Sequence, residues 1–250
     1  MDPSRTVLIA SDAHLGSTSP EQEAAFFTWL DQGADAASWI ILNGDVFDFW
    51  FEYRWGTTRG HDERLRRLRA VVDQGVRVTL MGGNHDWWGG PWLREHVGVE
   101  FLQEPLVADL GGRRCYVTHG DGLGSGDTIY RWVVRPMLHS AVTRFAFGML
   151  PPAIGDRIAG GVSETDHRWG PPGEGERRAA GRLVGWATRF LESRPDIECV
   201  LAGHCHVPSL EEHQPGQWYI NSGDWVHHRS YVVLEEGHTP RLEHWDGTIR

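Results

Sequence analysis

The sequence predicts an α/β fold, and two observations support that prediction. Short apolar runs alternate with amphipathic segments through roughly the first hundred residues, from Thr6–Ala10 to Val76–Met81. Strands separated by helices pair in parallel through right-handed crossovers. After Val99 the apolar runs follow one another with short connections, which indicates further, partly antiparallel sheet. A layered α/β sandwich with two packed mixed β-sheets flanked by helices satisfies both halves of the chain.

The first half of the chain alternates expected strands with expected helices. The strands are Thr6–Ala10, Ser38–Leu42 and Val76–Met81, and the helices are Glu21–Leu30 and Asp62–Val72. The first helix places Phe26 and Leu30 on one face. The second repeats Leu65, Leu68 and Val72 at helical spacing, so each helix has one apolar face for the core.

The second half supplies the remaining expected strands and one long helix. The strands are Leu106–Leu110, Gly112–Thr118, Cys199–Ala202, Trp218–Asn221 and Ser230–Glu235. Glu176–Leu191 is expected to be a core helix that returns the chain to the strand at Cys199.

A helical cap is expected between about residues 122 and 174, inserted into a single domain that spans residues 1–250. Ile129–Leu150 is apolar on much of its surface, and Pro136, Pro151 and Pro152 break it into shorter pieces. Gly170-Pro-Pro-Gly173 is a loop or hinge signal near the end of the insertion.

Composition narrows the class of protein. The net charge of −10, from 34 acidic and 24 basic residues, argues against nucleic acid as a partner, because nonspecific binding needs a basic face. Three cysteines do not form a disulfide framework. The first residues lack signal-peptide features, and no run approaches about 18 uncharged apolar residues. The expected location is therefore the cytoplasm.

Five short motifs carry the chemistry, and each follows an expected strand. They are Asp12-Ala-His14, Gly44-Asp45-Val-Phe-Asp48, Gly83-Asn84-His85-Asp86, His119 and Gly203-His204-Cys-His206. Residues that leave the carboxyl ends of neighbouring parallel strands converge on one crevice. Imidazole nitrogen and carboxylate or amide oxygen favour Mn, Fe or Zn over Mg or Ca. Cys205 alternates with two histidines, so in extended chain it points away from a metal site.

In this order the motifs resemble the signature of the calcineurin-like metallophosphoesterase family. Each piece alone is weak, but five in sequence are specific, and the resemblance covers most of the chain outside the cap. It implies that Asp12, His14, Asp45 and His206 hold one divalent metal ion. It implies that Asp45, Asn84, His119 and His204 hold a second one, with Asp45 bridging. Mn is the expected metal, with Fe or Zn as alternatives.

The resemblance also implies a mechanism. Two cations roughly 3.5–4 Å apart activate a water molecule as hydroxide, which attacks phosphorus in line with the leaving group. His85 would stabilise developing charge or protonate the leaving oxygen, and Asp86 would orient His85. Asp48 has either a direct role or a structural one as a hydrogen-bond acceptor.

Within the family the sequence is most similar to the UDP-2,3-diacylglucosamine hydrolases, which cleave a pyrophosphate in lipid A synthesis. The similarity rests on Gly44-Asp-Val-Phe-Asp-Phe-Trp50, on His119-Gly-Asp-Gly-Leu-Gly-Ser-Gly-Asp127 with Tyr130, and on the position of the cap. It implies a nucleotide-linked lipid as substrate, with Asp127 and Tyr130 in contact with it. It also implies peripheral contact between the cap and the inner membrane. No obligate protein partner is expected.

Two departures keep other substrates open. The best-known branch of that group has arginine where this chain has His85, and Gly161–Glu174 lacks its serine-, asparagine- and lysine-rich pattern. The alternatives are a phosphodiesterase or phosphatase on a soluble ester (cyclic nucleotide, dinucleoside polyphosphate or phosphoprotein), a nuclease, and a non-catalytic scaffold. Apolar cap residues such as Trp132 and Phe145 either line an acyl slot or pack the cap onto the core. Cap arginines such as Arg131 either meet phosphates or are simply solvated.

Overall fold

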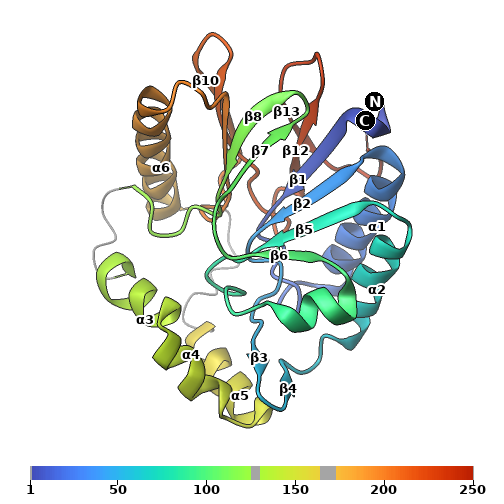
Figure 1. Cartoon of the computed structure of the whole chain (residues 1–250), viewed down its shortest axis with the longest axis vertical. Coiled ribbons are helices and arrows are strands. Elements are labelled where there is room, and N and C mark those ends of the chain that lie inside the picture. Colours follow the sequence, from blue (N-terminus) through green and yellow to red (C-terminus); the bar gives the residue numbers. More distant parts are fainter. Residues whose placement is uncertain (1, 125–129, 164–172, 250) are drawn as a thin grey trace.

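The computed structural model describes residues 2–124, 130–163 and 173–249, and it confirms the α/β sandwich. Two mixed sheets pack face to face, with α1 (Pro20–Ala36) and α2 (Asp62–Asp73) on one side and α6 (Glu174–Ser193) on the other (Figure 1). A short helix, η1, covers Pro3–Arg5, and a π-helical turn, η2, covers Leu93–Val97.

The larger sheet has the strand order β13-β12-β1-β2-β5-β6. Its strands are β1 (Thr6–Ala10), β2 (Trp39–Asn43), β5 (Arg77–Met81), β6 (Glu100–Leu102), β12 (Ser230–Glu235) and β13 (Arg241–His244). The strands β1, β2, β5 and β6 are parallel, whereas β12 and β13 pair antiparallel at one edge. The carboxyl ends of the parallel strands therefore share one edge of the sheet.

The smaller sheet has the order β10-β11-β9-β8-β7. Its strands are β7 (Leu106–Leu110), β8 (Arg113–Val117), β9 (Cys199–Ala202), β10 (Ser209–Gln214) and β11 (Gln217–Asn221). The central strands β8, β9 and β11 are parallel, and each edge strand pairs antiparallel with its neighbour.

Alternating side chains of the strands divide the core into layers. In β1, Val7 and Ile9 pack between the sheets, while Leu8 and Ala10 belong to the cluster that packs against α1 and α2. The strand β9 alternates in the same way between the intersheet layer and α6. Because both faces of these strands are buried, they are almost entirely apolar and lack the polar alternation of a half-exposed strand.

Helix α1 begins one residue before its predicted start and ends six residues after its predicted end. A capping box fixes the start: Gln22 N–H donates to Ser19 Oγ, and Ser19 N–H donates to Gln22 Oε1. The extension passes close to the sheet at Gly33, where an added Cβ would lie 3.1 Å from Ile40 and 3.2 Å from Leu8. A glycine that reads as a helix breaker is here the residue that allows close helix–sheet packing.

Five short or polar strands were missed in the sequence. They are β6, β10 and β13, already given, and the hairpin of β3 (Glu52–Tyr53) and β4 (Gly56–Thr57). The strand β10 is an edge strand with an exposed, polar run, and β3, β4 and β6 have two or three residues each. Such segments carry little hydrophobic periodicity, which is the signal that predicts strands.

Four short helical segments fall within the predicted cap and lie beyond the edge of the sheets, beside β3 and β4 (Figure 1). They are η3 (Tyr130–Val134), α3 (Arg135–His139), α4 (Ala141–Gly148) and α5 (Pro152–Ser163). Pro152 is the first residue of α5, where the missing N–H of proline costs no helical hydrogen bond. Pro136 instead lies within the continuous helical run of η3 and α3, near the change from one to the other.

The hairpin β3–β4 and its flanks support the cap. The ring of Phe147 on α4 lies 4.9 Å from Phe51 between centroids, and Arg54 N–H donates to Gly148 O at 2.9 Å. On α5, Asp156 Oδ1 accepts a 2.9 Å hydrogen bond from the hydroxyl of Tyr53.

No helix in the described ranges combines the length and apolar composition needed to cross a membrane.

His61 gives the fold a measurable pH dependence. Its ring is 6% exposed and packs against Phe47 and Trp50. Burial and then the charge of Arg64 lower the pKa of His61 to about 4. The unfolded chain takes up this proton near pH 6.5, so stability falls as the pH drops from 6.5 towards 4.

The variant His61→Gln should therefore become less destabilised, relative to the natural chain, as the pH falls. Urea unfolding at pH 7 and pH 5 should show the free-energy difference between the two proteins shift by about 2 kcal/mol in favour of the variant. A difference that is the same at both pH values would contradict a buried neutral His61.

Candidate functional site

The predicted motifs meet at the edge where the carboxyl ends of both sheets come together. Asp12, Asp45 and Asn84 follow β1, β2 and β5 of the larger sheet. His119 and His204 follow β8 and β9 of the smaller sheet. The crevice is thus built from both sheets, as the order of motifs along parallel strands predicts.

The candidate ligand residues adopt a backbone conformation that residues other than glycine rarely adopt. Positive φ angles are found at Asp12 (54°), His14 (45°), Asp45 (52°), His204 (68°) and His206 (52°). Arg229 is the one further non-glycine residue with positive φ in the described part of the chain. Each such residue costs on the order of 1–3 kcal/mol, so the surrounding contacts must hold them there.

Hydrogen bonds between the loops supply those contacts. Asp12 N–H donates to Gly44 O at 3.0 Å, and His14 N–H donates to Asp45 O at 3.0 Å. His204 N–H donates to Asp12 Oδ2 at 3.0 Å, which joins the loop after β1 to the loop after β9. These bonds fix the ligand-bearing loops of the two sheets relative to one another.

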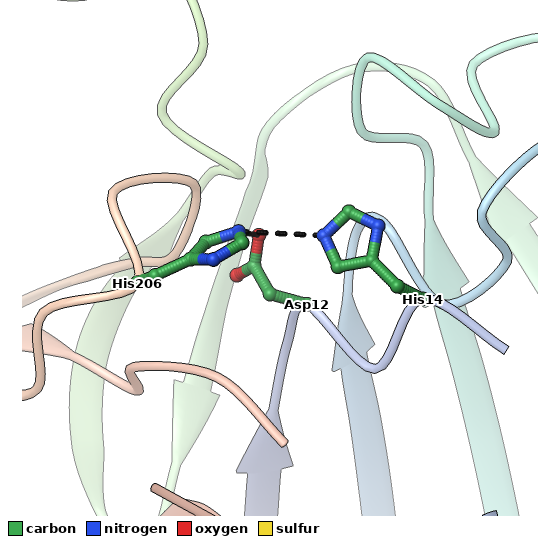
Figure 2. Close-up of side chains that lie close together, drawn as sticks. All are labelled: Asp12, His14 and His206. Atoms are coloured by element: carbon green, nitrogen blue, oxygen red, sulfur yellow. Dashed lines mark hydrogen bonds and ion pairs between the residues drawn. The ribbon is translucent and has the colours of Figure 1, made fainter. Parts of the chain in front are cut away.

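The first cluster consists of Asp12, His14 and His206, whose potential ligand atoms lie within 4.8 Å of one another (Figure 2). His206 Nε2 lies 3.3 Å from Asp12 Oδ1 and 3.3 Å from His14 Nε2. Asp12 Oδ1 is buried and has no hydrogen-bond partner among the described residues. Converging nitrogen and oxygen atoms with an unsatisfied lone pair suit a divalent cation.

The charges in this cluster differ between its two histidines. Burial lowers the pKa of His206, but the adjacent Asp12 carboxylate raises it to about 9. Burial and the neighbouring His85 lower the pKa of His14 to about 4. His14 is therefore neutral at pH 7 and has a lone pair available for a metal ion.

The second cluster consists of Asp45, His119 and His204. His119 Nε2 lies 3.2 Å from Asp45 Oδ2, and both side chains are almost fully buried. The other ring nitrogen, Nδ1, donates to Asn43 O at 2.8 Å, so the ring presents Nε2 to the site. Nε2 of His119 and Oδ1 of Asn84 are buried without a hydrogen-bond partner in the described part of the chain.

His85 and Asp48 lie beside the first cluster. Together with His14 they form a third group whose candidate ligand atoms are within 4.8 Å of one another. His85 Nδ1 donates to the carbonyl of Asp48 at 2.6 Å, while the Asp48 carboxylate lies 3.8 Å from His14 Nδ1. Asp48 thus orients His85 through its backbone.

The expected role of Asp86 in orienting His85 needs correction. In the described structure the Asp86 carboxylate is fully buried and is occupied by backbone N–H groups, not by the His85 ring. The four donors are those of Gly83, Asp45, Val46 and Phe47, at 2.8–3.3 Å. Burial and the charge of Asp45 raise the pKa of Asp86 to about 6. Asp86 holds the loop that carries Asp45, because those amides would otherwise be buried without acceptors.

Glycines before the ligands leave room for the ligand side chains. An added Cβ would lie 2.4 Å from His119 Nδ1 at Gly44 and 2.2 Å from Asp45 Oδ1 at Gly83. At Gly203 it would lie 2.7 Å from Asp12 Oδ2. The backbone of one motif therefore passes directly against the ligand of another.

Supporting residues complete the site, and two of them were not singled out in the sequence. Ser11 Oγ lies 2.7 Å from Ser222 Oγ, and Trp225 N–H donates to Asp12 O at 3.2 Å. The segment 221–225 therefore supports Asp12. Ser11 and Asn43 each directly precede a motif. Asn43 orients His119 through its backbone carbonyl, and a role of the backbone leaves no signal in the type of residue.

The cap reaches the site through α3. Arg135 Nε donates to Asp121 Oδ2 at 3.0 Å, two residues after His119. The His139 ring stacks on Trp87 with centroids 3.7 Å apart, and Trp88 Nε1 donates to Leu138 O at 2.9 Å. A cavity of about 150 Å³ lies between these contacts and His119.

The structure does not describe the side chains of the two residues predicted to contact the substrate, Asp127 and Tyr130. Asp127 lies outside the described residues. Tyr130 begins η3, and its side chain is also outside the described part of the structure.

The donor set fits two divalent cations. Two three-residue clusters offer imidazole nitrogen and carboxylate oxygen, and Asn84 adds an amide oxygen. Three of these atoms are buried without hydrogen bonds, an arrangement that is costly unless a cation compensates it. The chemistry that such a centre supports is hydrolysis of a phosphoester.

A family model and two similar sequences point to the same chemistry. A family model described as calcineurin-like phosphoesterase matches residues 5–208. The chain is 26% identical to a UDP-2,3-diacylglucosamine hydrolase from Porphyromonas gingivalis, covering 97% of this chain and 94% of that protein. It is 29% identical to a protein of the same name from Pseudomonas aeruginosa, with 88% and 91% covered. The solved structure of vacuolar protein sorting 29 from Cryptosporidium parvum aligns with a TM-score of 0.47 and 15% identity, covering 95% of each chain.

Gly83→Ala tests the close approach between motifs. The new Cβ would displace Asp45, which is shared by the proposed sites, so Mn²⁺ binding should weaken about 10–100-fold. Phosphodiester hydrolysis should fall by about 10²-fold. Calorimetric titration with Mn²⁺ and turnover of bis(p-nitrophenyl) phosphate measure both effects.

Gly175→Ala is the matched control, because an added Cβ there meets no atom within 4 Å and lies near the start of α6. It should bind Mn²⁺ and turn over the ester like the natural chain. Unchanged Mn²⁺ binding by Gly83→Ala would show that Asp45 does not need that space.

Proposed function

The chain belongs to the calcineurin-like phosphoesterase family, and we propose that it cleaves the pyrophosphate of UDP-2,3-diacylglucosamine or a similar nucleotide-linked lipid. It is a metal-dependent hydrolase. The observation that carries the proposed substrate is an apolar helical cap tied to the metal-ligand loops. Relatives that cover about nine-tenths of the chain are named UDP-2,3-diacylglucosamine hydrolases, which supports the same substrate.

We propose that the ligand sets divide as the clusters do. Asp12, His14 and His206 would hold one cation, and Asn84, His119 and His204 the other, with Asp45 between them. Mn²⁺ is the proposed metal, and the nitrogen and oxygen donors also suit Fe or Zn. When bound, the cations would polarise phosphoryl oxygens and lower the pKa of water, so that it attacks phosphorus at neutral pH.

His85 is the proposed proton donor to the leaving oxygen. Burial lowers its pKa, but the charge of Asp45 and the hydrogen bond to Asp48 O raise it overall. Because Nδ1–H is held by that carbonyl, the protonated ring can donate only from Nε2. A raised pKa favours the protonated ring, and delivery of the proton from a fixed atom is what general-acid catalysis requires. Asp86 contributes by holding the Asp45 loop.

The cap supplies a surface for the lipid. Trp132, Val142 and Phe145 are 70%, 77% and 68% exposed, although they are large and apolar. Phe147, in contrast, packs on Phe51 and anchors α4 to the core. Exposed apolar side chains next to arginines are typical of helices that rest on an anionic bilayer surface. The cap would therefore sit on the cytoplasmic face of the inner membrane, where its substrate resides.

The substrate is tested with Mn²⁺-loaded protein and UDP-2,3-diacylglucosamine in detergent, with products followed by mass spectrometry. UMP and the lipid-linked sugar 1-phosphate should appear much faster than products of a generic phosphodiester. Asp45→Ala should remain folded by circular dichroism and lose about 10³-fold or more in turnover, because Asp45 joins both proposed metal sites.

Two outcomes would change these conclusions in different ways. Metal-dependent cleavage of the generic ester without turnover of the lipid would remove the substrate and keep the two-metal chemistry. It would favour a soluble phosphoester instead. Full activity of folded Asp45→Ala would overturn the bridging role of that carboxylate.

Membrane contact is tested by flotation with vesicles that contain anionic phospholipid. The double variant Trp132→Ser and Phe145→Ser should bind at least about tenfold more weakly, since each ring contributes on the order of 1.5–3 kcal/mol when it is buried. Val107→Ser, on the exposed strand β7, is the control and should float like the natural chain. Equal flotation of all three proteins would remove the cap from the proposed membrane contact.

A further inference from the structure

A small second pocket adjoins the candidate metal site, and neither Asp121 nor Arg135 lines it. It has a volume of about 70 Å³ and lies between the loop 120–124 and the first half of α6. His204, of the second ligand cluster, forms part of its wall, and Arg131 and Arg182 also line it. Any group in this pocket would therefore lie next to the reacting centre.

The pocket is cationic. Arg131 Nη1 donates to Gly124 O at 3.3 Å, which uses one of its five N–H groups. Arg182 has no side-chain hydrogen bond or carboxylate partner among the described residues. Asp121, the acidic residue of the loop 120–124, lines the larger cavity beside His119 instead and pairs with Arg135 at 3.0 Å. Its charge is therefore offset there and does not neutralise the two arginines.

The loop and the helix hold these arginines in place. Gly124 has φ of +80°, and an added Cβ there would lie 2.9 Å from the carbonyl oxygen of Arg182. Gly120 has φ of +111° and packs in the same way against Leu183, where a Cβ would lie 3.3 Å from that side chain. The glycines allow the backbone of the loop to lie directly on α6, so the backbone at Arg182 is held against the loop that lines the pocket with His204.

We propose that Arg131 and Arg182 bind the phosphate of a diphosphate substrate that is not attacked. This rests on the proposed function, in which the substrate carries two linked phosphates. A cation pair at Asp45 compensates the charge of only one of them. Guanidinium groups suit the other, because they stay charged and offer planar pairs of N–H donors to phosphate oxygens. The pocket would thus select diphosphates over simple phosphodiesters.

The test compares the binding of α,β-methylene-UDP, a diphosphate that cannot be hydrolysed at its bridge, with the binding of UMP. Calorimetry on Mn²⁺-loaded protein should show that Arg182→Ala lowers the preference for the diphosphate by about tenfold or more. Arg182→Lys should recover part of that preference, since it keeps the charge without the planar pair of donors.

Arg189→Ala is the matched control, because Arg189 lies two turns further along α6, is exposed and does not line the pocket. It should keep the ratio of the two affinities found for the natural chain. The proposal is overturned if Arg182→Ala and Arg189→Ala have the same ratio. An equal loss of both ligands in Arg182→Ala would also overturn it, by showing a general disturbance of the site.

These results separate the pocket from the proposed substrate. A diphosphate preference that depends on Arg182, in a protein that does not cleave the lipid, would keep the pocket and remove the substrate. Lipid cleavage by a protein whose diphosphate preference does not depend on Arg182 would keep the proposed substrate and remove the proposed role of the pocket.

Discussion

The site depends above all on the burial of three carboxylates that follow three neighbouring strands, β1, β2 and β5. Asp12, Asp45 and Asp86 are each at most 2% exposed, and buried like charges repel strongly. The fold offsets this in two ways. Backbone N–H groups converge on Asp86 and on Asp12, and imidazole rings face Asp12 and Asp45. The left-handed backbone angles at the ligand residues follow from it, because the loops must turn sharply to aim both amides and side chains inward.

The intersheet arrangement explains why these groups can meet. Each sheet brings a different part of the site, and hydrogen bonds cross from one to the other. Nδ2 of Asn43, the last residue of β2, donates to the carbonyl of Thr118, directly after β8, at 3.0 Å, while the carbonyl of Asn43 orients His119. The apolar layer between the sheets keeps these partners at a fixed separation. At this edge of the sheets, the packing of the core therefore also determines the geometry of the site.

The sequence predicted the framework well because buried strands carry a strong signal. The bounds of β1, β7, β9 and β12 were predicted without error, and the ligand motifs followed from their places at strand ends. Asp86 was misread because adjacency to His85 suggests a pair, whereas the turn of the backbone directs its carboxylate to the amides of another loop. The polar edge strand β10 and the extension of α1 past Gly33 were missed because tertiary packing decides both. No pattern in a single sequence records which loop will lie against which.

The place of the cap in the chain has an evolutionary consequence. It is inserted between the loop that carries His119 and the helix that leads to His204, and it rests on the core through side chains such as Phe147 and Arg135. The candidate metal ligands and the hydrogen bonds that hold them lie outside this insertion. Mutations that reshape the cap can therefore change what the protein recognises without rebuilding its hydrolytic machinery. Specificity and reactivity can diverge at different rates within one domain.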